Sequence, residues 1–82
     1  MRQYNEAEAV RNIQRYLRRL SYTDPSIPSV PIDGIFGEAT RVSLMAFQRK
    51  KGLAASGIAD RESWSALYES YLASMRRYTS PS

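Results

Sequence analysis

The chain has 82 residues, and it contains neither cysteine nor histidine. A chain of this length forms one domain around one small core, and the missing residue types exclude disulfide bonds, thiolate metal sites and acid–base catalysis by histidine. The formal net charge of +4 and the pI near 9.8 fit a polyanionic partner, such as nucleic acid or an anionic cell wall, and fit equally well a soluble helical surface rich in arginine.

Membrane and export signals are not evident in the chain. No run approaches the roughly 20 apolar residues of a membrane span. Residues 1–6 carry one arginine, and no apolar stretch follows them as it would in a secretory signal. We therefore expect no membrane span. A domain that acts outside the membrane would have been excised from a longer protein or would arrive by another route.

The first predicted helix begins near Asn5, which can cap it together with Glu8 in a capping box. Apolar residues then recur at intervals of three and four, at Val10, Ile13, Leu17 and Leu20. The helix should end near residues 21–22, because Pro25 disfavours helix in the residue before it. Residues 23–31 hold three prolines and are expected to form a structured loop that buries Ile27, Val30 and Ile32.

The second predicted helix follows a turn at Asp33-Gly34, where glycine supplies a positive φ. Ile35 and Phe36 are expected to fill the core, and Gly37 to start the helix. Its inward face comprises Thr40, Ser43, Leu44 and Phe47, and Gly52 lies just past its end.

The third predicted helix is capped by Asp60, and its inward stripe comprises Trp64, Leu67, Tyr68, Tyr71, Leu72 and Met75. The predicted fold is all-α, a small three-helix bundle in a single domain over residues 1–78. Its core should span about residues 5–76, and residues 79–82 are expected to form a flexible tail.

One segment occurs twice. Residues 33–40 (DGIFGEAT) recur as residues 56–63 (SGIADRES), and each copy is followed at the same distance by a leucine, Leu44 and Leu67. Two copies are too few for a solenoid, which needs three or more units. The repeat therefore indicates a duplicated helix–turn module rather than an enzyme.

The same residues resemble the peptidoglycan-binding domain 1 family. The resemblance is carried by VxxIQxxLxxLSY from Val10, DGIFGxxT from Asp33 and LxxFQxxxGL from Leu44, and it runs from about Val10 to Leu67. Members of that family are three-helix modules with an internal duplication, usually appended to cell-wall hydrolases, amidases and transpeptidases. The chain departs from the family at Ser21, where glycine is usual, and at Ser56 and Ala59 in the second turn.

The resemblance implies a non-catalytic module that binds peptidoglycan and targets an associated lytic or wall-remodelling enzyme to its substrate. Glycan strands or stem peptides would be its partners, with a covalently linked hydrolase beside it. Its location would be the cell wall or the extracellular space, and a phage-derived product would look the same.

Five residues form the predicted ligand site: Tyr22, Asp33, Phe36, Arg41 and Gln48. An aromatic ring can stack on a sugar face, and the planar fork of Arg41 matches a stem-peptide carboxylate. We also expect Asp33 to bond the backbone of its own turn, and the amides of Gln14 and Gln48 to tie down the loops. Trp64 is a core residue whose ring can lie half exposed at a binding surface.

An enzymatic role is not predicted. The carboxylates of Asp33, Glu38, Asp60 and Glu62 form no pair in a known motif, and no histidine activates a serine. Their spacing does not match a calcium loop either, so we expect neither a metal site nor a cofactor.

Two alternative functions remain open at this point. A basic helix-turn-helix-like domain could bind nucleic acid through Arg11, Arg15, Arg18 and Arg19, although the start of the third helix is a poor recognition element, so nucleic acid is not the partner we expect. Alternatively, Tyr16, Tyr68, Tyr71 and Tyr78 could mark the surface of a structural or protein-interaction module.

Overall fold

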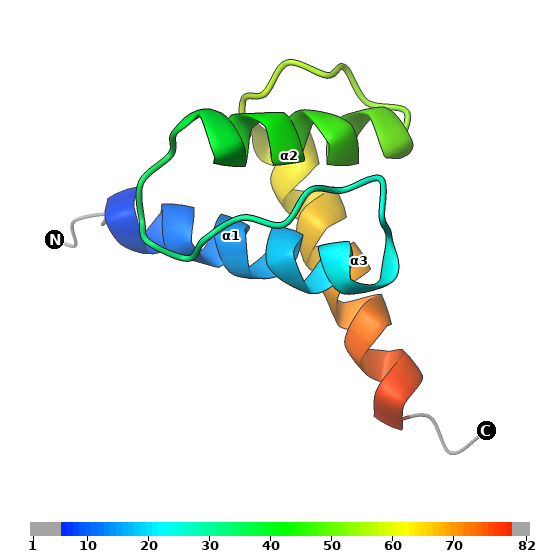
Figure 1. The fold of residues 1–82 in the computed structure, drawn as a ribbon. Helices are drawn as coiled ribbons and strands as arrows, with labels where there is room; N and C mark the ends of the chain where they lie inside the picture. The colour runs from blue at the N-terminus through cyan, green and yellow to red at the C-terminus, as the bar shows by residue number, and fades with distance from the viewer. Residues whose placement is uncertain (1–5, 80–82) are drawn as a thin grey trace, which may run out of the picture.

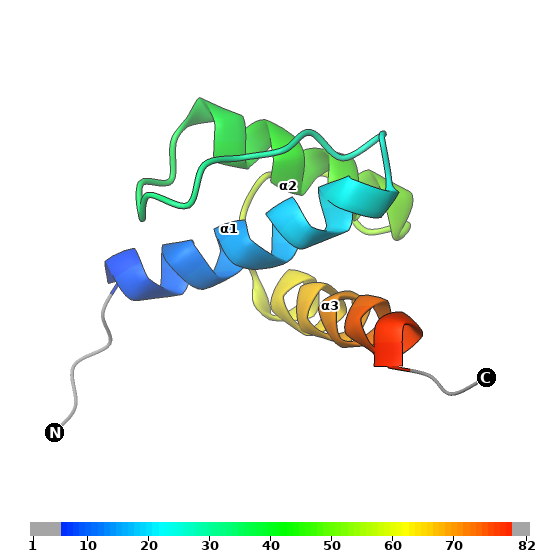
Figure 2. The same cartoon turned by 60° about the horizontal axis from the view of Figure 1, so that its bottom comes forward.

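The computed structural model describes residues 6–79, and within them it contains three helices and no strand (Figure 1). Helix α1 spans Glu6–Thr23, α2 spans Glu38–Lys50 and α3 spans Arg61–Thr79. Seen after a rotation, α1 lies between α2 and α3 (Figure 2). The predicted all-α three-helix bundle is therefore confirmed.

Helices α1 and α2 run in roughly the same direction (Figure 1). The loop between them must therefore return toward the start of α1. In Figure 1 the loop after α1 runs back along that helix before α2 begins, and the loop after α2 runs back over α2 before α3 begins. The duplicated sequence thus corresponds to a duplicated path, a helix followed by a returning loop.

One leucine from each helix lies at the centre of the core. Leu17, Leu44 and Leu67 are completely buried, and each contributes about 1.5–3 kcal/mol through its removal from water. The returning loop after α1 adds Ile27 and Val30 to the buried set, whereas Ile32 stays partly exposed. The rest of the apolar core is formed by Ile13, Leu20 and Phe47.

The helix ends agree with the predicted signals to within two residues. Helix α1 ends at Thr23, and its predicted cap, Asn5, lies outside the described residues. Gly37 is the N-cap of α2 and makes no side-chain cap bond. At α3 the cap is confirmed, because Asp60 Oδ1 accepts a hydrogen bond from the Ser63 N–H at 2.9 Å. Residues 1–5 and 80–82 are not described, so the predicted tail is mostly outside the structure.

Two predicted core residues of the first turn are in fact at the surface. Ile35 is 66% exposed and Phe36 is 38% exposed. The turn is attached to α1 through its backbone, as described below, so that its side chains project away from the core. The prediction that both residues fill the core is therefore wrong.

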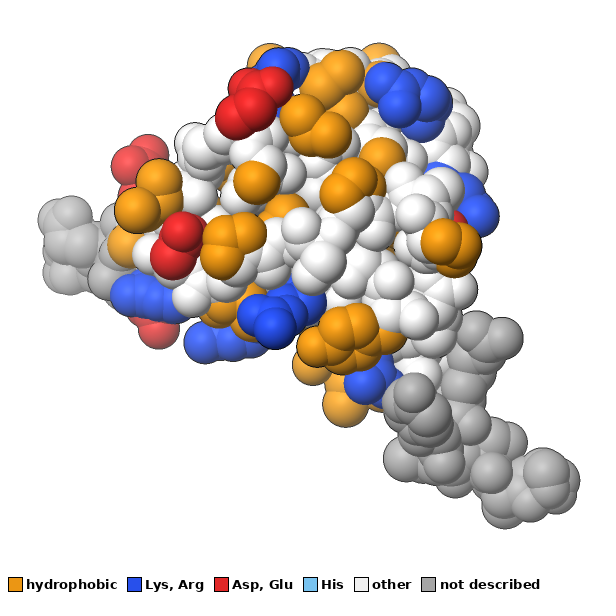
Figure 3. Space-filling model, in the orientation of Figure 1, with side chains coloured by type: hydrophobic (Ala, Val, Ile, Leu, Met, Phe, Trp, Pro, Cys, Tyr) orange, Lys and Arg blue, Asp and Glu red, His pale blue; other side chains and the backbone are white. Residues whose placement is uncertain are grey.

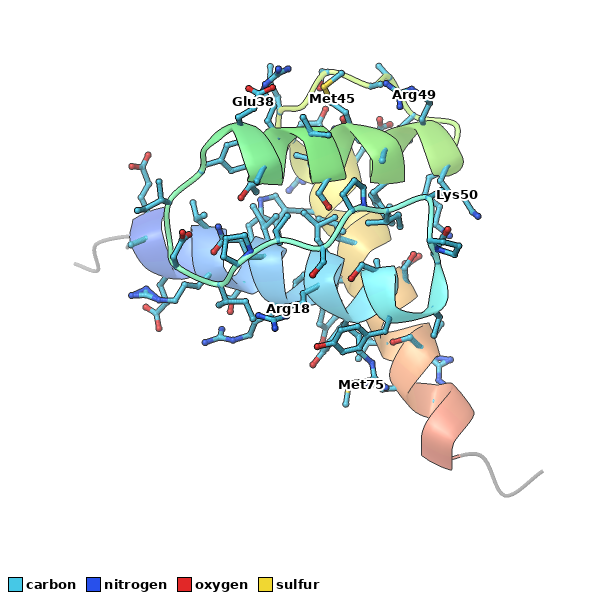
Figure 4. All side chains as sticks on the ribbon, viewed as in Figure 1. Arg18, Glu38, Met45, Arg49, Lys50 and Met75 are labelled. Atoms are coloured by element: carbon cyan, nitrogen blue, oxygen red, sulfur yellow. The ribbon has the colours of Figure 1, made fainter. Side chains whose placement is uncertain are left out.

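The predicted inward face of α3 is correct only in part, and Tyr71 and Leu72 are partly buried. Leu67 is buried and Trp64 is partly buried, but Tyr68 and Met75 are exposed. Tyr71 and Ser74 still meet α1, through the Tyr16 ring and through a 3.4 Å hydrogen bond from Arg19 Nε to Ser74 Oγ. Beyond these contacts the C-terminal end of α3 extends past α1 and α2 (Figure 1). Met75 is labelled on this extension in Figure 4.

The tyrosines proposed as an exposed partner surface differ in their exposure to solvent. Tyr16 and Tyr71 are partly buried with ring centroids 4.7 Å apart, and Tyr16 also meets Trp64 edge-on at 6.3 Å. Burial, followed by the neighbouring phenols of Tyr68 and Tyr71, raises the pKa of Tyr16. The Tyr78 side chain lies outside what the structure describes.

Candidate functional site

A buried glutamine of α1 holds the first turn. The Oε1 atom of Gln14 accepts hydrogen bonds from the backbone N–H groups of Asp33 and Gly34, at 3.0 and 2.9 Å. Its Nε2 atom lies 3.0 Å from each of three acceptors, which are Asp33 Oδ1, the Ile35 carbonyl and Thr40 Oγ1. One side chain therefore joins the helix before the turn, the turn itself and the helix after it.

Gln48 of α2 makes the equivalent bonds to the second turn. Its Oε1 accepts from the Gly57 N–H at 2.9 Å, and its Nε2 donates to the Ile58 carbonyl at 3.0 Å and to Ser63 Oγ at 2.8 Å. Both glutamines are completely buried. The prediction that the two amides tie down the loops is confirmed.

Asp33 and Ser56 occupy matching positions in the two turns, and each accepts a hydrogen bond from the backbone N–H two residues later. Asp33 Oδ1 accepts from the Ile35 N–H at 3.0 Å, and Ser56 Oγ accepts from the Ile58 N–H at 3.1 Å. The Ile35 N–H and then the Gln14 amide stabilise the carboxylate, which lowers the pKa of Asp33. The replacement of aspartate by serine thus keeps the turn but removes its charge.

The two turn glycines allow the backbone to approach the helices closely. Gly34 and Gly57 have φ of 78° and 75°, a region that side chains disfavour. A Cβ atom on Gly57 would lie 2.8 Å from Cγ of Arg41, and one on Gly34 would lie 3.3 Å from the carbonyl oxygen of Ala7. The second turn therefore packs against α2 and the first against the start of α1.

A groove of about 630 Å³ is formed where both turns meet the first half of α1 and the start of α3. Each turn contributes its glycine, and the two aromatic residues at the groove are Phe36 and Trp64. Glu6 is the charged residue of the lining. The remaining lining residues are apolar: Ala7, Ala9, Val10, Ile13, Ile58 and Ala59.

The structure brings together only some of the predicted site residues. Phe36 lines the groove, and Arg41 flanks the groove through its contact with Gly57. Asp33 is exposed beside Gly34, but its Oδ1 atom already serves the turn. Tyr22 lines a different hollow near the end of α1, and Gln48 is buried with its amide bonded to protein groups.

Arg41 is held at the outer face of α2, on which Figure 4 labels Glu38 and Met45. Its Nη2 and Nε atoms donate to the Glu38 carboxylate at 2.9 and 3.3 Å, and Nη1 lies 3.3 Å from the sulfur of Met45. The pair is well exposed to solvent, so that the guanidinium can exchange this carboxylate for another one at small cost.

Sequence reasoning did not include Ile58 or Val10 in the site and treated Trp64 as a core residue. The sequence repeat pairs Ile58 with Ile35, and the structure shows that both are strongly exposed, at 65% and 66%. Two exposed isoleucines at the same turn position have no role in the core.

Candidate metal sites and membrane-spanning helices are both absent from the described residues. Among residues 6–79 no cluster of three acidic side chains is placed to hold a metal ion. In the same range no helix is sufficiently long and apolar to cross a bilayer.

Comparison with known families agrees with this architecture. The family model for the peptidoglycan binding domain matches residues 6–67, which include α1, both turns, α2 and residues 61–67 of α3. Searches of curated proteins and of solved structures returned no match. The matched range covers every residue that lines the groove, and the chain belongs to the peptidoglycan binding domain family.

Proposed function

We propose that this domain binds peptidoglycan, without catalysing a reaction, through the groove between its two turns, and that it brings an associated wall-active enzyme to its substrate. The observation that carries the proposal is the lining of the groove by both copies of the repeated turn. Family membership supports peptidoglycan as the ligand. The site of action would be the cell wall.

The lining suits the less polar parts of the polymer. The faces of the sugar rings, the acetamido methyl groups and the alanine methyl groups of stem peptides can all be buried against Phe36, Trp64 and Ile58. Arg41 lies beside the Gly57 turn, where it can meet a stem-peptide carboxylate. In this proposal Asp33 and Gln48 position the turns and do not touch the ligand.

An open groove of this kind gives modest affinity. Covalent linkage to a hydrolase would compensate, because a short flexible tether gives an effective concentration on the order of millimolar for the second partner. Weak, rapidly exchanging binding also lets an enzyme move along an insoluble polymer.

The internal repeat supplies a matched pair of variants for the test. Ile58 lines the groove, whereas Ile35 has the same turn position and the same exposure but does not line it. Binding of soluble muropeptides to the labelled domain would be followed by NMR. We expect Ile58→Ser to weaken binding about fivefold, the equivalent of roughly 1 kcal/mol of lost apolar contact, and Ile35→Ser to leave it unchanged.

Chemical shift changes in the wild-type domain should concentrate at Val10, Phe36, Ile58 and Trp64. Equal losses for the two isoleucine variants, or no shifts with muropeptides, would contradict the proposal. A short DNA duplex serves as the control for the helix-turn-helix alternative, and steeply salt-dependent binding of the duplex would favour that alternative.

A further inference from the structure

A second surface, near the C-terminal end of α1, combines arginine and tyrosine side chains. Arg15, Arg18, Arg19 and Tyr22 follow one another at helical spacing along one face of α1. Together with Ile32 and Tyr71 they line a shallow hollow of about 270 Å³. No residue of this basic–aromatic surface belongs to the groove between the turns.

Two arginines of this surface, Arg15 and Arg18, differ from Arg41 and Lys50, which form ion pairs. Arg41 is paired with Glu38 and Lys50 with Asp24, at 2.9 Å in each case. Arg15 and Arg18 are exposed, and within the described residues neither forms an ion pair, although Arg15 Nη1 donates to Asn12 Oδ1 at 2.7 Å. No acidic residue lines the hollow.

Figure 3 shows basic side chains gathered along the lower edge of α1, next to hydrophobic side chains near the crossing of α1 and α3. Figure 4 labels Arg18 on this outer edge of the helix. Like charges this close repel each other, and a ligand with several negative charges would relieve the repulsion.

The side-chain chemistry favours phosphate. A guanidinium presents a planar fork of donors that binds phosphate oxygens in pairs, and a phenol adds a further donor. Tyr22 is 64% exposed beside the arginines, so its hydroxyl is available to a ligand. Arg15 and Arg18, both exposed and three residues apart on one helix face, match a polymer with repeated charges better than a single terminal carboxylate.

We propose that the basic–aromatic surface binds a phosphodiester-linked polyol polymer of the cell wall, as a second contact independent of the groove. The wall location of this ligand rests on the proposed function. A single-stranded nucleic acid would carry the same phosphodiester charge, but its binding usually depends on several exposed rings on which successive bases stack. Here only Tyr22 is strongly exposed, because Tyr71 packs against Tyr16.

The test uses the full chain and a synthetic glycerol phosphate oligomer at about 50 mM salt, with affinity measured by calorimetry or NMR titration. The double variant Arg15→Gln/Arg18→Gln is compared with Arg49→Gln/Arg61→Gln, which removes the same charge from exposed positions elsewhere. We expect the first variant to bind at least about tenfold more weakly. Its affinity should also depend less steeply on salt, with the magnitude of the slope of log affinity against log salt reduced by roughly 1 to 1.5. The control variant should lose much less.

Equal losses for the two double variants would overturn the proposal, because net charge alone would then explain binding. Thymidine oligonucleotides with the same number of phosphates provide the second arm, and binding as tight as that of the glycerol phosphate oligomer would overturn it in favour of nucleic acid. Absence of binding to either oligomer would overturn it as well.

Phosphate-free muropeptides separate this inference from the proposed function. Arg15→Gln/Arg18→Gln should bind them as well as the wild-type domain does. A domain that binds glycerol phosphate but no muropeptide would contradict the groove proposal alone, and the reverse result would contradict the second contact alone.

Discussion

The side-chain amides of Gln14 and Gln48 hold two turns in the same way, although Gly34 lies 20 residues after Gln14 and Gly57 only 9 residues after Gln48. Each glutamine reaches the turn from the preceding helix and also bonds the first turn of the following helix, at Thr40 or Ser63. The same set of hydrogen bonds is therefore repeated although the distance in sequence from the glutamine to its turn differs.

Replacement of Gln48 by alanine should destabilise the domain by about 2–4 kcal/mol, because the buried partners of its amide, the Gly57 N–H and Ser63 Oγ among them, would lose their hydrogen bonds in a site that is closed to water. Gln14→Ala should cost a similar amount. Urea unfolding measures both, with the exposed Ser65→Ala as control. A loss below about 1 kcal/mol would show that water replaces the amide.

Substitution of Gly57 by alanine should cost more than the same change at Gly52. The two glycines share a φ near 75°, so both variants carry the left-handed penalty of about 1–2 kcal/mol. Gly57 also has close neighbours, because a Cβ there would lie 2.8 Å from Cγ of Arg41 and 3.3 Å from Cγ of Met45, whereas one on Gly52 would meet nothing within 4 Å. Arg41 must leave its rotamer, at a further cost of about 0.5–1.5 kcal/mol. Thermal unfolding of both variants gives the difference in stability, and Arg41→Ala should reduce this difference, since only the Met45 contact would remain. An equal cost at the two sites would show that Arg41 moves freely.

Removal of the Glu38 charge should strengthen binding of muropeptides that carry free carboxylates. Glu38→Gln releases Arg41 from its present partner, and an exposed pair of this kind is worth about 0.2–1 kcal/mol, so that affinity should rise by up to roughly fivefold. Arg41→Ala should lower it without reducing thermal stability. Glu62→Gln changes the first turn of α3 in the same way and serves as the control. Muropeptides with amidated stem peptides should bind Glu38→Gln and the wild-type domain with equal affinity.

Stability should fall in acid through Asp24. Hydrogen bonding by the Ser26 side chain, followed by Lys50, lowers the pKa of Asp24 from 3.8 to about 2. A carboxyl whose pKa is lower in the folded state stabilises it above the unfolded pKa and loses this effect as pH falls. The melting temperature of the wild-type domain should thus exceed that of Asp24→Asn at pH 6, and the two should converge between about pH 4 and pH 2. A constant difference across that range would exclude this carboxylate as the cause.

Local signals in the sequence were sufficient for the helices and for the turns. The spacing of Ile13, Leu17 and Leu20 identified the buried face of α1, and Asp60 marked the start of α3, because capping and amphipathic periodicity act over a few residues. The role of Gln14 also followed from its matching place in the repeat.

Features that depend on where one element ends relative to another could not be read in this way. Ile35 and Phe36 are apolar, but the Gln14 bonds fix the turn through its backbone and leave both side chains at the surface. Tyr68 and Met75 have the spacing of an inward stripe but are exposed, and Met75 lies where α3 extends beyond α1 and α2 (Figure 1). Tyr22 and Phe36 flank one loop in sequence and line separate hollows, since that loop runs back along α1.

Each turn is held in place by the side chain of a helix residue. Its position therefore does not depend on the length of the loop that leads to it. The returning loop after α1 is the longer of the two, and Ser29 lies on its solvent side. Residues inserted at Ser29 would separate the buried Ile27 and Val30, whereas a cysteine substituted there keeps the loop length and leaves Gln14 bonded to Gly34. Because the chain has no other cysteine, Ser29→Cys would carry a single fluorophore on the solvent side of this loop.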